Sequence, residues 1–138
     1  MLSKKSSNDR LELFSKVKSI ADHIIQTRLD TGNTLVFAKQ IASELKVDYN
    51  VFDNLFLSEY GITLERVYVM RVVEKVKELL VYTEQSLKQI AGALGYNNPS
   101  SLSDILKYNT GFTPTYFKQI RKNKLEIIRK QQTEQNGN

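Results

Sequence analysis

The sequence predicts an all-α protein of about seven helices, with two helix-turn-helix subdomains joined by a long linker helix. Apolar residues recur three and four positions apart along most of the chain, whereas the alternating pattern of strands is weak. In addition, residues 41–63 are repeated as residues 90–113. The first copy has Ile41, Ala42, Leu45, Phe52, Leu55, Phe56, Gly61 and Thr63, and the second has Ile90, Ala91, Leu94, Leu102, Ile105, Leu106, Gly111 and Thr113.

Residues 1–33 are expected to form an N-terminal tail and the first helix. Apolar residues at helical spacing predict this helix from about Asp9 to Leu29, with Asn8 as its N-cap. The polar run at residues 30–33 contains a glycine and is expected to end the helix.

The first helix-turn-helix subdomain is assigned to residues 34–63. Thr34 is expected to cap a second helix that ends near Leu45. Asp48 is expected to cap the third helix, because a side-chain oxygen at this position accepts a hydrogen bond from the first helical turn. Gly61 then ends the third helix in a left-handed conformation.

The linker helix is assigned to residues 64–82. Helical periodicity predicts that it starts at Thr63 and continues to about Val81. A single helix of this length would hold the two repeats at a fixed distance from each other.

The second helix-turn-helix subdomain, together with most of the last helix, is assigned to residues 83–124. Ser86 is expected to cap the fifth helix. Asn98 followed by Pro99 is expected to open the sixth helix, and Gly111 is expected to close it as Gly61 closes the third.

The last helix is expected to begin at Thr113-Pro114 and to continue to about Lys130. Residues 125–138 are therefore assigned to a helix end and a tail. The segments Met1 to Ser7 and Gln131 to Asn138 are both polar, and we expect both to be disordered.

Composition limits the possible classes of protein. The 138 residues are 41% hydrophobic and 25% charged, which fits a globular protein with a core. There is no cysteine, so disulfides and thiolate metal sites are excluded. No apolar run approaches the roughly 20 residues that span a bilayer, and no signal peptide is recognisable. We therefore expect a cytoplasmic protein without a membrane partner.

The net charge of +5 is unevenly distributed. Residues 114–138 carry six basic and two acidic side chains, whereas residues 34–63 carry two basic and four acidic ones. A positive C-terminal end suits a polyanionic partner.

No residue pattern indicates an enzyme, a cofactor or a metal site. His23 is the single histidine and lacks the partners that catalysis or metal binding requires. No phosphate-binding loop, nucleophile elbow or dinucleotide fingerprint occurs. The aromatic residues at core spacings are expected to pack in the interior. They are Phe14, Phe37, Phe52, Phe56, Tyr68, Tyr96, Phe112 and Phe117.

The second repeat carries the most specific motif of the chain. It consists of the run from Ser86 to Tyr96, then Leu102-Ser103-x(2)-Leu106-Lys107, then Gly111-Phe112-Thr113-Pro114-x(2)-Phe117-Lys118. With this motif, residues from about 34 to 122 resemble the DNA-binding domain of the AraC/XylS family of bacterial transcription regulators. The resemblance implies that the second helix of each pair enters successive major grooves, and that the chain is a stand-alone form of the domain.

The residues at the predicted turn of the second repeat fit this motif. Gly95 is expected in a tight turn, where a side chain would force an unfavourable backbone angle. Ala91 is small enough for the two helices to cross closely. In the first repeat Lys46 replaces the glycine, so the first turn is less well specified.

The resemblance also carries base-reading positions over to the second helix of each pair. Asparagine can form two hydrogen bonds with adenine, and serine can bond any base edge. The expected base-reading residues are Asn50, Asp53, Asn54, Ser100, Ser101, Ser103 and Asp104. The family often has arginine near the position of Asp104, and basic residues where this chain has Leu57-Ser58-Glu59. Acidic side chains repel phosphates, so the first subdomain is expected to be the poorer reader.

Basic residues at the end of the sixth helix and along the last helix are the candidates for phosphate contacts, which add affinity with little sequence preference. They are Lys107, Lys118, Arg121, Lys122 and Lys124. For Lys124 taken singly, a position on a solvated helix face is an equally good interpretation.

Two functional hypotheses follow. The first is a sequence-specific regulator of transcription that binds double-stranded DNA as a monomer or weak homodimer. The alternative is a protein-interaction module with a degenerate DNA-binding surface, which would act through a partner such as RNA polymerase. Its motivation is the acidic character of the first subdomain together with Asp53 and Asp104. The first helix could also pair two protomers through Leu11, Phe14 and Val17.

Overall fold

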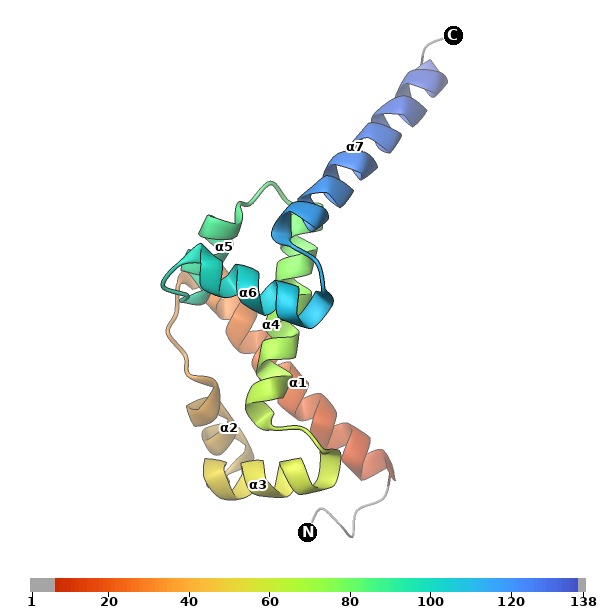
Figure 1. Cartoon of the computed structure of the whole chain (residues 1–138). Coiled ribbons are helices and arrows are strands. Elements are labelled where there is room, and N and C mark those ends of the chain that lie inside the picture. The colour runs from red at the N-terminus through yellow and green to blue at the C-terminus, as the bar shows by residue number, and fades with distance from the viewer. Residues whose placement is uncertain (1–6, 137–138) are drawn as a thin grey trace. The chain divides into compact units, whose positions relative to one another are not determined.

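The computed structural model describes residues 7–136, and Figure 1 shows the order of the helices along the chain. Within these residues there are seven α-helices and no strand, which confirms the predicted all-α class. None of the helices in this range combines the length and the apolarity needed to cross a membrane. The helices are α1 (Ser7–Thr31), α2 (Phe37–Leu45), α3 (Tyr49–Tyr60), α4 (Leu64–Tyr82), α5 (Leu87–Leu94), α6 (Pro99–Thr110) and α7 (Pro114–Asn136).

The chain divides into two compact units. Within the described residues, the N-terminal unit comprises residues 7–72 and 93–95, and the C-terminal unit comprises residues 73–92 and 96–136. The division falls inside α4, so the predicted linker helix contributes residues to both units. Helix α1 belongs to the same unit as α2 and α3.

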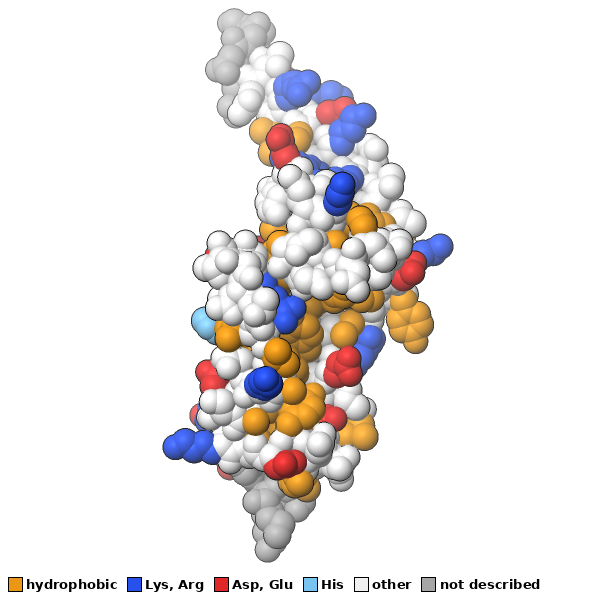
Figure 2. Space-filling model, turned by 90° about the vertical axis from the view of Figure 1, so that its left-hand side faces the viewer, with side chains coloured by type: hydrophobic (Ala, Val, Ile, Leu, Met, Phe, Trp, Pro, Cys, Tyr) orange, Lys and Arg blue, Asp and Glu red, His pale blue; other side chains and the backbone are white. Residues whose placement is uncertain are grey.

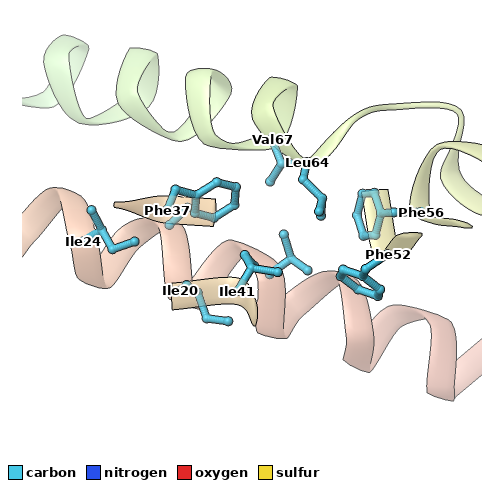
Figure 3. Packing of buried hydrophobic residues seen from close by; sticks show 10 residues of the cluster. Ile20, Ile24, Phe37, Ile41, Phe52, Phe56, Leu64 and Val67 are labelled. Atoms are coloured by element: carbon cyan, nitrogen blue, oxygen red, sulfur yellow. The ribbon is translucent and has the colours of Figure 1, made fainter. Parts of the chain in front are cut away.

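The core of the N-terminal unit is built by α1, α2, α3 and the first turns of α4, whose buried side chains point toward one another in Figure 3. Each large apolar side chain removed from water contributes about 1.5–3 kcal/mol. This burial explains why α1 packs beside the first helix pair. The buried members of the cluster are Val17, Ile20, Ala21, Ile24, Phe37, Ile41, Phe52, Phe56, Leu64 and Val67.

The packing of α1 corrects one expectation. Val17 is fully buried in this core, and the ring of Phe14 stacks on that of Phe56 with centroids 5.7 Å apart. Val17 and Phe14 therefore pack within the N-terminal unit. Of the three residues expected to pair two protomers, only Leu11 is well exposed.

Two helix caps of the N-terminal unit agree with the caps predicted from the sequence, and two differ from them. Asp48 accepts a hydrogen bond from Val51 N at 3.0 Å, and Gly61 ends α3 at a φ of 72°, as predicted. Thr34 is not the N-cap of α2, because the helix begins after Val36, which offers no side-chain bond. Asn8 lies inside α1 and not before it.

The C-terminal unit has the predicted caps. Ser86 Oγ accepts from Gln89 N at 3.1 Å, while Gln89 Oε1 accepts from Ser86 N at 2.8 Å, so each residue satisfies the other's backbone. Asn98 caps α6 through Ser101 N, and Gly111 ends it at a φ of 79°. The buried residues of this unit include Val76, Leu80, Ile90, Ala91, Leu102, Leu106 and Phe117.

Helix α7 is longer than predicted. It begins at Pro114 as expected but continues to Asn136, so the expected disordered tail from Gln131 is wrong as far as residue 136. The remaining tail residues, 137–138, and the N-terminal segment 1–6 lie outside the described residues.

Candidate nucleic-acid interface

The second helices of the two repeats, α3 and α6, match position by position at an offset of 50 residues. Each helix buries an equivalent pair of apolar side chains. Phe52 and Phe56 face the core from α3, and Leu102 and Leu106 are buried on α6. The opposite face of each helix is exposed, and it contains most of the residues expected to read bases.

The exposed face of α3 is uncharged. Successive helix residues turn by about 100°, so five exposed positions fall within an arc of about 140°. These five residues, the α3 arc, are Asn50, Val51, Asn54, Leu55 and Ser58. The sixth exposed residue of α3, Leu57, lies about 20° outside this arc. Helix α3 contains no lysine or arginine. The α3 arc therefore presents two carboxamides, one hydroxyl and two aliphatic side chains.

The two acidic residues of α3 make internal contacts and lie outside the α3 arc. Asp53 is half-buried, and its Oδ1 accepts a hydrogen bond from Leu64 N at 2.8 Å, at the start of α4. Glu59 Oε1 pairs with Arg10 Nε of α1 at 2.8 Å. The structure thus gives Asp53 a capping role at the start of α4, and its base-reading role stays a prediction. Burial raises the pKa of Tyr49, and the negative charges of Asp53 and Glu65 raise it further.

The exposed face of α6 is polar. Ser100 Oγ and Ser101 Oγ donate hydrogen bonds to Asn98 Oδ1, at 2.8 and 3.2 Å. These two expected base readers are therefore oriented by the helix cap, and their oxygen lone pairs remain as acceptors. Ser103 is half-buried, whereas Asp104 is exposed. Within the described part of the chain, Asp104 has no hydrogen-bond or ion-pair partner.

Three of the five residues expected to bind phosphate are held by the end of α4 and the following loop. Lys118 donates a hydrogen bond to the carbonyl of Gln85. Arg121 donates to the Val81 carbonyl at 3.4 Å, and its Nη2 lies 3.8 Å from Glu84 Oε1.

The third of these residues, Lys124, donates to Tyr82 Oη at 3.1 Å, and its ammonium lies 4.8 Å from the centroid of that ring. The other two candidates, Lys107 and Lys122, are exposed. Among the described residues they have no hydrogen-bond or ion-pair partner, so their ammonium groups can reach a polyanion.

Several exposed residues were not predicted from the sequence. Tyr108 is 85% exposed and lies on the same face of α6 as Asp104. The repeat offset of 50 residues matches Tyr108 to Ser58 of the α3 arc, and this match was the signal that could have identified it. Phe112 was expected in the core, but it is 45% exposed and stacks on Tyr116 with centroids 4.0 Å apart. Figure 2 shows hydrophobic side chains at the surface between charges of both signs.

The turns before α3 and α6 both adopt a left-handed conformation. Gly95 has a φ of 87°, which confirms the predicted tight turn. A Cβ added there would lie 3.3 Å from Arg28 Nη1. Lys46 ends α2 at a φ of 55° and a ψ of 51°, so the first turn forms without a glycine. A side chain in this conformation costs about 1–2 kcal/mol.

Residues 41–120 match a protein family described as Helix-turn-helix domain. No curated protein matches the chain. Among solved structures, the C-terminal domain of AraT, a response regulator from Geobacillus stearothermophilus, is 24% identical with a TM-score of 0.58. The similarity covers 76% of this chain and 84% of that one.

Two further solved structures share the fold. A DNA-binding transcriptional dual regulator from Escherichia coli K-12 is 19% identical with a TM-score of 0.61, over 78% of this chain and 93% of that chain. A transcriptional regulator from Chromobacterium violaceum, described as AraC-type, is 23% identical with a TM-score of 0.55, over 61% of this chain and 75% of that one.

Proposed function

The chain belongs to the AraC-type helix-turn-helix family of DNA-binding transcription regulators, and from this premise we propose that it binds specific duplex sequences through the exposed faces of α3 and α6. Both the family and the fold are those of transcription regulators and not of enzymes. The observation that carries the proposal is that each repeat buries one face of its second helix and exposes hydrogen-bonding side chains on the other.

Helix α6 carries side chains that suit base contacts and side chains that suit phosphate contacts. Ser100, Ser101 and Asp104 would meet base edges, where a carboxylate accepts from the amino group of cytosine. Lys107 follows one turn later and would bind a phosphate. Exposed Lys122 on α7 would add a second phosphate contact. Affinity would then come from the lysines and sequence preference from the serines and Asp104.

We also propose that α3 and α6 of one chain enter successive stretches of major groove, so that a single chain covers two half-sites about 34 Å apart. The repeat supports the same role for both helices, because they have equivalent N-caps in Asp48 and Asn98 and equivalent C-caps in Gly61 and Gly111. The site would be asymmetric because the exposed residues of the two helices differ.

The alternative of a protein-interaction module depends on acidic residues at the reading helices. Asp53 and Glu59 bond internally, so neither contributes a negative charge to the α3 arc. Asp104 is the one acidic residue of α6. This distribution favours DNA as the partner over a protein-interaction module, and contact with RNA polymerase stays a prediction.

Selection of bound duplexes from random DNA, followed by polarisation titrations, tests the proposal. We expect a defined asymmetric motif with two half-sites, and at least a hundredfold weaker binding to a shuffled duplex at moderate salt. Inserting five base pairs between the half-sites should abolish most of this preference, since it rotates one groove to the opposite side of the helix. Equal binding to every duplex would refute sequence reading.

A further inference from the structure

The α3 arc differs from the matched positions of α6 in one respect that the proposed function does not explain. Val51 is 59% exposed and Leu55 is 51% exposed. The matched positions in α6 are Ser101 and half-buried Ile105. The packing face of α3 is already provided by its two phenylalanines, so the exposed aliphatic side chains are not required for the core.

The neighbours of these two side chains indicate what they contact. Asn50 and Asn54 lie within the same arc as Val51 and Leu55. In the major groove, adenine presents the N6 and N7 groups that a carboxamide bonds, and its partner thymine presents a C5 methyl group that favours apolar contact. A helix face that combines carboxamides with aliphatic groups therefore matches A·T base pairs.

The other bases are poorly matched by α3. Guanine presents two acceptors that arginine or lysine reads best, and α3 contains neither residue. Cytosine presents an amino donor that a carboxylate reads, but Asp53 is half-buried and caps α4. The side chains of the α3 arc therefore match adenine and thymine best.

We propose that Val51 and Leu55 read the methyl groups of thymines, so that the half-site beneath α3 is rich in A·T pairs. This inference rests on the proposed function and specifies the sequence class that α3 recognises. The uncharged arc also means that α3 contributes specificity while the lysines of the C-terminal unit supply most of the attraction to phosphate.

Replacement of thymine by deoxyuridine tests the inference directly, because it removes the methyl group and keeps the base pair. The probe is the duplex that the wild-type protein selects from random DNA. We expect about fourfold weaker binding for each contacted thymine replaced in the α3 half-site, which corresponds to the burial of one methyl group.

The variant Val51→Ala/Leu55→Ala should bind the thymine duplex more weakly and should no longer distinguish it from the uracil duplex. Ile127→Ala is the matched control, because Ile127 is a 56% exposed aliphatic residue on α7, which belongs to the C-terminal unit. This control should keep the full preference for thymine. Circular dichroism and thermal melting of each variant verify the fold.

The possible outcomes separate the two proposals. If no duplex is selected, the proposed function fails, and the inference fails with it. If a duplex is selected but uracil and thymine bind equally, only the inference is overturned. If the double variant binds DNA like the wild type, the aliphatic side chains do not contact bases, and the inference is overturned while the proposed function stands.

Discussion

Arg28 Nη1, on α1, donates a hydrogen bond of 2.9 Å to the carbonyl of Leu94, the last residue of α5. Its Nη2 donates to the carbonyl of Leu35 at 2.7 Å, ahead of α2. One guanidinium therefore donates hydrogen bonds to two backbone carbonyls that lie at helix ends and accept no helical hydrogen bond. The buried Nε of Arg28 has no hydrogen-bond partner among the described residues.

Arg28→Ala should lower the free energy of unfolding by about 2–4 kcal/mol, because two charge-assisted hydrogen bonds are lost and two carbonyls lose their partner. Arg28→Lys can keep one of the bonds and should lose about half as much. Urea denaturation followed by circular dichroism measures both. Equal stability of Arg28→Ala and wild type would show that solvent replaces the guanidinium.

Asp53→Ala should destabilise the protein by about 1 kcal/mol, the usual cost of losing a cap, without altering the selected DNA motif. Asp53→Asn keeps an acceptor oxygen for Leu64 N and should retain most of the stability. Thermal melting gives the first quantity and duplex selection the second. A changed base preference at unchanged stability would contradict this expectation and support Asp53 as a base reader.

Lys107→Ala should weaken binding to all duplexes and lower the slope of log affinity against log salt by about one unit. Its stability should match wild type, since the side chain has no partner among the described residues. Lys118→Ala should behave differently and destabilise the protein by about 1 kcal/mol, because Lys118 holds the carbonyl of Gln85. Titrations at several salt concentrations, together with urea denaturation, distinguish the two roles.

Asp104→Ala should change the base preferred in the α6 half-site and strengthen binding to unrelated duplexes, since it removes an exposed negative charge near phosphate. Comparison of motifs selected by the variant and by wild type measures the effect. An identical motif would mean that Asp104 contacts no base.

Lys46→Gly should stabilise the protein by about 0.5–1 kcal/mol. The φ of 55° at Lys46 strains a residue with a Cβ, and removal of the strain outweighs the added freedom of glycine in the unfolded chain. Gly111→Ala, at a φ of 79°, should instead destabilise the protein. A loss of stability in Lys46→Gly would show that the lysine stem makes a favourable contact that exceeds the strain.

The sequence by itself determined the positions of the helices and most of their ends. Caps such as Asp48, Ser86 and Asn98 bond backbone groups within three residues, and glycine at a helix end acts through its own φ. Such signals are local, so they can be read without knowing the fold. The length of α7 was missed, because its polar last turns carry no apolar periodicity.

Only the tertiary structure decided which polar side chains of the candidate site remain available for DNA. Asp53 bonds Leu64 N, Glu59 pairs with Arg10, and Lys118 bonds the carbonyl of Gln85. These partners lie from 11 to 49 residues away along the chain, and no pattern of residue spacing indicates them. The sequence therefore located the second helix of each repeat, whereas the packing decided which of their polar side chains stay exposed without an internal partner.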